Sequence, residues 1–246
     1  MTLFHEAYLF EPEEFARVVA PLMHASALSR EGYSLVRSEA IRLFDTNAQV
    51  RVLADEYGGW DRQGILTEIP EDEPRHVGDV AFWLVLLVYG SVRKVNQRLG
   101  LAGNWEFASD MLKRLGWDNY QRECLISGHS FRYFGHRYLS DASESGDAKT
   151  DAKTVWDYMN RSFQSGTIGW LDLVDNQSLM RTLREDQDKL FSLHSPFFRE
   201  VKALPSHNQD DITTDRAFLQ TLHQSAIDML DSAIRNRNGL CVIISG

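Results

Sequence analysis

The stretch from Ala81 to Tyr89, AFWLVLLVY, is the longest apolar run in the chain. A membrane-spanning helix needs about 20 apolar residues, so a run of this length indicates a helix buried inside a protein. The surrounding pattern extends that helix over about residues 77–99, and Gly100 ends it. Because its middle is apolar on every side, we expect it to be the central helix of a mainly α multi-helix globule.

Residues that favour helix starts and helix ends divide most of the remaining chain into further helices. Pro12, followed by two glutamates, begins the first of them, and Asp118 with Gln121 resembles a capping box. The other expected helices are Ser34–Tyr57, Trp105–Leu115, one capped by Asp175 that continues through Leu193, and one capped by Thr214 that continues through Arg237.

The segment Gly239–Ser245, GLCVIIS, differs from these helices because it is apolar and rich in β-branched residues. It predicts a short buried strand. A single strand leaves its backbone groups without partners, and the only comparable segment is HEAYLF at His5–Phe10. We therefore expect a small β element that pairs the N-terminal and C-terminal segments.

The clearest break in the pattern is the polar segment 141–154, DASESGDAKTDAKT, which has no apolar residue larger than alanine. Such a composition predicts a flexible loop. The helical parts on its two sides are each small, so we expect one domain over residues 1–246 with this loop inside it.

The charge balance and the two cysteines indicate a cytoplasmic protein. The net charge is −9, which disfavours a nucleic-acid partner, because phosphate binding needs a basic surface. Neither a secretory signal nor a membrane-spanning segment is present. Cys124 and Cys241 lie outside any Cys/His cluster, so we expect buried free thiols, as in a reducing compartment, and no membrane partner.

The segment Ser127–Tyr138, SGHSFRYFGHRY, concentrates the groups that hold ligands. If it is helical, residues three, four and seven apart share one face. An arginine can bind phosphate or carboxylate through two hydrogen bonds, and imidazoles can donate to the same anion. The candidate ligand-binding residues on and beside that face are His129, Arg132, Tyr133, His136 and Arg137.

Other interpretations of the same segment stay open. Both histidines fit a structural role, in which they satisfy polar neighbours under an aromatic cluster. Two histidines seven apart are about 10.5 Å apart along a straight helix, too far to share one ion, so no metal ligand is predicted. The chain has no phosphate loop, dinucleotide fingerprint or HExxH motif, so neither a cofactor nor a catalytic residue is identified.

The six tryptophans are a further candidate feature. Several of them, including Trp170 after Gly169, directly follow a glycine. Tryptophan rings in such positions usually pack at the edge of the hydrophobic core and less often line a ligand pocket.

We therefore expect a cytosolic binding or accessory protein that recognises a small anionic ligand or a partner protein through residues 127–138. One alternative is an enzyme in which His129 or His136 is the general acid/base and Arg132 or Arg137 stabilises an anion. A second alternative is a protein-interaction role through the acidic outer faces, without a small-molecule site.

Overall fold

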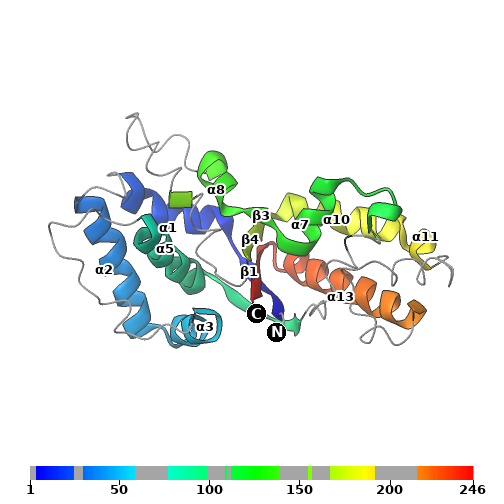
Figure 1. The fold of residues 1–246 in the computed structure, drawn as a ribbon, viewed down its shortest axis with the longest axis horizontal. Helices are drawn as coiled ribbons and strands as arrows, with labels where there is room; N and C mark the ends of the chain where they lie inside the picture. The colour runs from blue at the N-terminus through cyan, green and yellow to red at the C-terminus, as the bar shows by residue number, and fades with distance from the viewer. Residues whose placement is uncertain are drawn as a thin grey trace.

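The computed structural model describes residues 4–24, 30–58, 77–98, 109, 112–138, 155–156, 167–191 and 215–245. These residues form a mainly helical fold with one antiparallel sheet (Figure 1). The mainly α prediction and the pairing of the two terminal segments are both confirmed. None of the helices in the described residues is both long and apolar enough to cross a lipid bilayer.

The last strand of the chain is the middle strand of the sheet, and each strand is antiparallel to its neighbours. Its pairing with the first strand runs from Phe4 opposite Ser245 to Phe10 opposite Gly239. In order across the sheet, the strands are β2 (Arg93–Arg98), β1 (Phe4–Phe10), β5 (Gly239–Ser245), β4 (Thr167–Leu171) and β3 (His129–Ser130).

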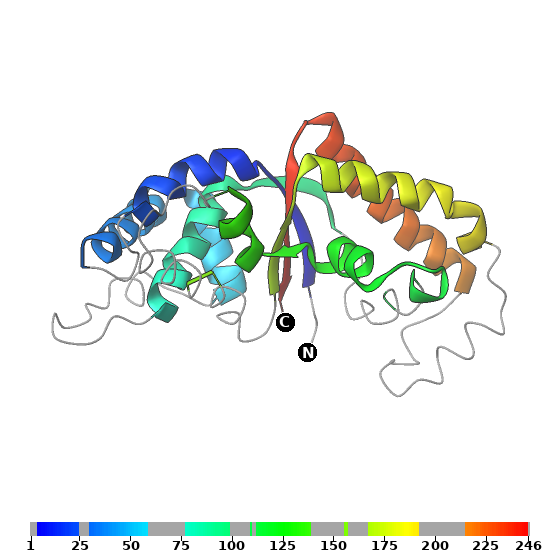
Figure 2. The same ribbon diagram turned by 90° about the horizontal axis from the view of Figure 1, so that it is seen from above.

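Helices cover both faces of this sheet (Figure 2). Side chains alternate along a strand, so Tyr8 and Phe10 of β1 enter one core while Ala7 and Leu9 enter the other. The first core contains α1 (Pro12–His24), α2 (Arg30–Thr46), α3 (Ala48–Gly58), α5 (Val77–Ser91) and α8 (Phe131–Tyr138). The second contains α7 (Asn119–Ser127), α10 (Leu173–Glu185) and α13 (Asp215–Arg235), and α11 (Gln187–Phe191) follows α10.

The helix expected over about residues 77–99 is shorter than predicted and is not central. It ends at Ser91, and Arg93–Arg98 forms the edge strand β2. The polar sequence of that strand, RKVNQR, suits an edge. The helix is deeply buried, as expected, but it packs against α2 and α3 inside one helical layer, and the sheet lies in the middle.

Several other predicted boundaries change for identifiable reasons. The helix expected at Ser34–Tyr57 is two helices, because the Asn47 side chain caps the second by accepting from the backbone N–H of Gln49 at 3.0 Å. The helix expected to be capped by Asp175 and to continue through Leu193 is capped by Asp172 instead and ends at Glu185. The last helix ends at Arg235.

Of four further predictions, one is confirmed and the other three concern residues that the structure describes only in part or not at all. The capping box of Asp118 and Gln121 is confirmed. Most of the Trp105–Leu115 helix, the Thr214 cap and the loop at 141–154 lie outside the described residues.

Two glycines permit a close backbone approach between the end of α7 and strand β4. Gly128 has a φ of +70°, a conformation that glycine adopts without strain. A Cβ atom on Gly169 would lie 1.9 Å from the carbonyl oxygen of Ser127. The approach lets β3 pair with β4, and this pairing places His129 opposite Trp170.

We predict that Gly169→Ala destabilises the protein by about 3 kcal/mol, because the added methyl group meets a backbone atom that cannot rotate away. Gly90→Ala in α5 is the matched control. Its Cβ would meet only the flexible end of Leu43 at 3.0 Å, and alanine favours the helix by up to about 1 kcal/mol. Urea unfolding of the two variants measures the difference, and equal stability would show that β4 does not need this close approach.

Candidate functional site

A pocket of about 580 Å³ opens where α7, the short strand β3, α8 and strand β4 meet. Its wall combines aromatic rings with ionisable groups. These rings and groups include Tyr120 and Cys124 of α7, His129 of β3, Tyr133 and Arg137 of α8, and Trp170 of β4.

The structure brings three of the five predicted site residues to this pocket, which are His129, Tyr133 and Arg137. The side chains of Arg132 and His136 lie outside what the structure describes. The expectation of one helix face is wrong, because α7 ends at Ser127, Gly128 turns the chain, and α8 begins only at Phe131. His129 therefore lies on a strand and cannot align with His136 on one helix.

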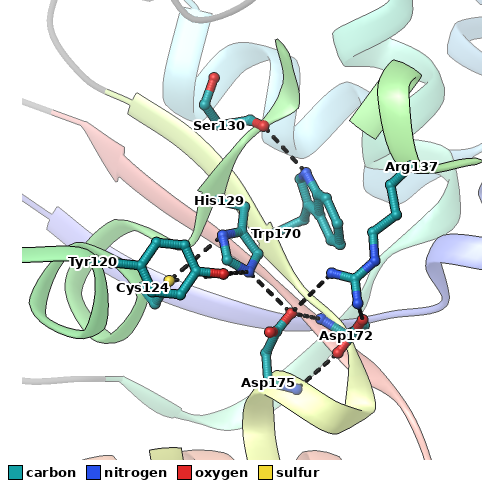
Figure 3. A network of polar contacts seen from close by, with 8 residues as sticks. All are labelled: Tyr120, Cys124, His129, Ser130, Arg137, Trp170, Asp172 and Asp175. Carbon is teal, nitrogen blue, oxygen red and sulfur yellow. Dashed lines mark hydrogen bonds and ion pairs between the residues drawn. The ribbon is translucent and has the colours of Figure 1, made fainter. Parts of the chain in front are cut away.

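His129 is the centre of the polar contacts in the pocket (Figure 3). Its Nε2 atom lies 3.0 Å from Oδ2 of Asp175, and its Nδ1 atom lies 3.5 Å from Sγ of Cys124. The ring is buried, and its centroid lies 5.2 Å from that of Trp170. The Tyr120 hydroxyl lies 3.4 Å from Nε2. The carboxylate of Asp175 therefore contacts Nε2, while the Cys124 sulfur lies beside the ring, nearer Nδ1 than Nε2, from which it is 3.9 Å away.

Arg137 is also paired. One of its terminal nitrogens lies 2.5 Å from Oδ2 of Asp172, and the other lies 3.6 Å from Oδ2 of Asp175. Its guanidinium group lies 5.6 Å from the centroid of the Trp170 ring, within cation–π range. These two carboxylates already neutralise the positive charge that was expected to hold an anion.

Both carboxylates belong to the capping box that begins α10. The Asp172 side chain accepts from the backbone N–H of Asp175 at 2.7 Å, and the Asp175 side chain accepts from the backbone N–H of Asp172 at 3.1 Å. The sequence explains the placement, because aspartates three residues apart at the end of a strand satisfy the first amides of the following helix.

The environment moves the pKa values of these two carboxyl groups in opposite directions. Burial raises the pKa of Asp172, the nearby charge of Asp175 adds to that effect, and Arg137 only partly offsets it. Burial also acts to raise the pKa of Asp175, but the hydrogen bond from His129 and those at the cap outweigh it, so its pKa is lowered. Asp175 is therefore the carboxylate that stays ionised against His129.

The thiol and the phenol beside His129 stay protonated at neutral pH. Burial, together with the charge of Asp175, raises the pKa of the Cys124 thiol to about 12. Burial, Cys124 and Asp175 likewise raise the pKa of the Tyr120 hydroxyl to about 12. Both groups can therefore donate hydrogen bonds in the pocket.

The arrangement of these groups suits proton transfer. Among the residues that the structure describes, no three His, Cys, Asp or Glu side chains are grouped so as to hold a metal ion. An imidazole whose one nitrogen is held by a carboxylate can accept a proton at the other.

Sequence reasoning missed five of the residues that form this site. Cys124 was expected to be a buried free thiol, which it is, but its contact with His129 depends on the turn at Gly128. The two aspartates are more than 40 residues beyond His129, and only the pairing of β3 with β4 brings them close. A signal was present for Trp170, which follows a glycine, whereas none was present for Tyr120. The missed residues are Tyr120, Cys124, Trp170, Asp172 and Asp175.

Comparison of the chain with protein-family models, with curated proteins and with solved structures finds no match in any of the three. The geometry of the pocket is therefore the basis for the function proposed below.

The opposite pKa shifts predict that Asp175→Asn costs more stability than Asp172→Asn. At pH 7 we expect a loss of about 1–2 kcal/mol for Asp175→Asn, because the folded state stabilises its charge, and of at most about 0.5 kcal/mol for Asp172→Asn, because asparagine is an equally good cap. Asp118→Asn at the exposed cap of α7 is the matched control and should change little.

Urea unfolding at several pH values measures this difference. A carboxyl group whose pKa is lowered on folding contributes stability at neutral pH and loses it as the pH falls through its folded pKa. The difference in the free energy of unfolding between the wild type and the Asp175→Asn variant should therefore become smaller as the pH falls. A larger loss for Asp172→Asn than for Asp175→Asn would contradict the assignment of the charge to Asp175.

Proposed function

We propose that this protein binds a small organic molecule in the pocket between α7, β3, α8 and β4. The observation that carries the proposal is the convergence of aromatic rings with His129 and Arg137 around one volume of about 580 Å³. Pockets for small molecules are typically about 300–1,000 Å³, mostly apolar, with a few polar groups that orient the ligand.

The ligand has an aromatic or apolar body. Trp170, Ile168 and Tyr133 line the pocket, and the Tyr133 side chain is half-exposed where it borders the opening. Flat side chains of this kind bind rings and alkyl chains with little loss of side-chain entropy. The polar end of the ligand then faces His129, Cys124 and Tyr120 at the wall.

An uncharged polar end fits this wall better than an anion. The charge of Arg137 is neutralised by Asp172 and Asp175, and Glu123 also lines the pocket. A carboxylate or phosphate would lie close to these like charges. The sequence-based expectation of a small anionic ligand stays a prediction, as does the alternative of a protein-interaction role through the acidic outer faces.

We predict that naphthamide binds the wild-type protein and that naphthoate, its anionic counterpart of the same shape, binds at least about tenfold more weakly. Tyr133→Ala should weaken naphthamide binding by about threefold to tenfold, because one ring contact is lost. Val52→Ala is the control, since Val52 is an exposed side chain of α3 that does not line the pocket.

Calorimetric titration gives the affinities, and saturation-transfer NMR shows which part of the probe contacts the protein. If neither probe binds, or if both variants bind naphthamide equally well, the proposal is wrong. Tighter binding of naphthoate would contradict the preference for an uncharged ligand.

A further inference from the structure

We propose that Cys124, His129 and Asp175 form a nucleophilic triad, and that the ligand of this pocket is an aryl ester or a thioester whose acyl group is transferred to the Cys124 thiol. This inference rests on the proposed small-molecule pocket and assigns a chemistry to its polar wall. It differs from the enzyme alternative drawn from the sequence, in which no nucleophile was identified.

The three side chains follow the order carboxylate, imidazole, thiol that such a triad needs. Asp175 contacts one ring nitrogen of His129, Nε2, at 3.0 Å, and Cys124 is nearest the other, Nδ1, at 3.5 Å. The ionised Asp175 has no proton to donate, so the hydrogen on this contact belongs to Nε2. In the neutral ring Nδ1 is then a bare acceptor 3.5 Å from the thiol sulfur, which lies beside the ring and 3.9 Å from Nε2.

Regular elements hold each member of the triad. Cys124 lies in the last turns of α7, and its carbonyl accepts from the N–H of Gly128 at 3.1 Å. His129 is paired with Trp170 in the sheet, and Asp175 lies in the first turn of α10 within its capping box. Groups placed on helices and strands keep their mutual geometry better than groups on loops.

The protonated state of the thiol decides how the triad works. With a pKa of about 12, Cys124 is not a resting thiolate. A base must therefore remove its proton as the sulfur attacks, and Nδ1 of His129 is the acceptor within 3.5 Å. This requirement separates the site from one in which a stable thiolate–imidazolium pair exists before substrate binds.

The reaction balances with water as the second substrate. The Cys124 sulfur forms a bond to the carbonyl carbon, its proton moves to Nδ1 of His129, and the carbonyl electron pair moves to oxygen. When the carbonyl re-forms, the bond to the leaving group breaks and that group takes the proton from Nδ1. Water, deprotonated by His129, then attacks the thioester and releases the acid and the thiol.

Tyr120 supplies a donor for the oxygen that becomes negative. Its hydroxyl hydrogen bonds to the Cys124 thiol and lies 3.4 Å from Nε2 of His129. Because its pKa is raised to about 12, the hydroxyl keeps its proton and can stabilise the developing charge.

The aromatic wall of the pocket, with Trp170 and Tyr133, suits a substrate that has an aryl or apolar group, and the chemistry of the leaving group narrows the class further. The tetrahedral intermediate expels whichever group leaves more easily, and a sulfur of high basicity leaves slowly. A thiol or phenol of lower pKa is expelled in preference to Cys124, whereas an amine is not. Activated acyl compounds therefore fit this site, and simple amides do not.

Para-nitrophenyl butyrate is the probe for this reaction, applied to the full chain at pH 7. We expect a burst of about one nitrophenol per chain, and peptide mapping by mass spectrometry should find the butyryl group on Cys124. Cys241, which is fully buried, is the internal control and should carry none. A butyryl group on lysine alone, or no burst, would overturn the triad.

Three variants test the individual roles. Cys124→Ala should abolish the burst, and His129→Gln should slow acylation by about 10²–10⁴-fold, because the general base is lost. Asp175→Asn, which removes only the charge of a positioning residue, should slow it by about tenfold or more. Asp55→Asn, a change at an exposed position of α3 that does not line the pocket, should leave the rate unchanged.

The pH profile separates catalysis from structural damage. In His129→Gln the acylation rate should climb with pH towards the thiol pKa of about 12, because hydroxide becomes the base. The wild-type rate should depend less steeply on pH, because His129 removes the thiol proton in place of hydroxide, and the Asp175→Asn profile should move towards that of His129→Gln. Identical profiles for all three proteins would show that His129 is not the base.

A measurement on the wild type avoids any dependence on variants that unfold. Iodoacetamide should alkylate Cys124 of the folded protein well before Cys241, and prior butyrylation should block that alkylation. Equal labelling of both thiols, at the rate of global unfolding, would contradict the triad.

The two proposals can fail separately. If naphthamide binds but Cys124 is never acylated, the triad is wrong and the pocket remains a binding site. If Cys124 is acylated while naphthamide does not bind, the aromatic character of the ligand is wrong and the triad stands.

Discussion

The close approach of the backbone around Gly128 to that around Gly169 is the constraint on which the site depends. Ser127 and Gly169 come so near that no side chain fits between them. This contact lets two residues of β3 pair with β4 and brings the chain from the helical layer of α7 to that of α8 (Figure 2). His129 lies on this connecting segment. Asp172 and Asp175 lie at the start of α10, directly after β4 ends. Without the approach, the imidazole and the carboxylates would belong to separate parts of the fold.

The electrostatics of the pocket follow from the start of α10. A helix N-terminus stabilises negative charge, and here two aspartates serve as the cap. Asp172 is buried and Asp175 partly buried, the two carboxylates do not ionise with equal ease, and the hydrogen bond from His129 favours the charge on Asp175. Arg137 bridges the pair and lies against the Trp170 ring. The capping box of α10 therefore also orients the imidazole of His129. Asp172 and Asp175 thus have both a structural role and a chemical role.

Local sequence patterns were sufficient for the terminal strands but not for the rest of the sheet. Gly239–Ser245 is apolar and β-branched, and its need for a partner pointed to the N-terminal segment. Strand β2 is polar and follows an apolar helix directly, so it was mistaken for the end of that helix, and β3 has only two residues. Three of the five candidate residues reach the pocket, but for a different reason from the one that selected them, because the turn at Gly128 separates His129 from α8. The aspartates could not be found locally, since only a long-range strand pairing joins them to His129.

The most direct test concerns the hydrogen on the His129 ring. Long-range proton–nitrogen NMR spectra distinguish the two neutral tautomers of a histidine and also the protonated ring. With Asp175 in contact with Nε2, the wild-type protein should show the hydrogen on Nε2 and a bare Nδ1 towards Cys124, and Asp175→Asn should weaken that preference. A hydrogen on Nδ1 in the wild-type protein would leave no base facing the thiol and would contradict the triad.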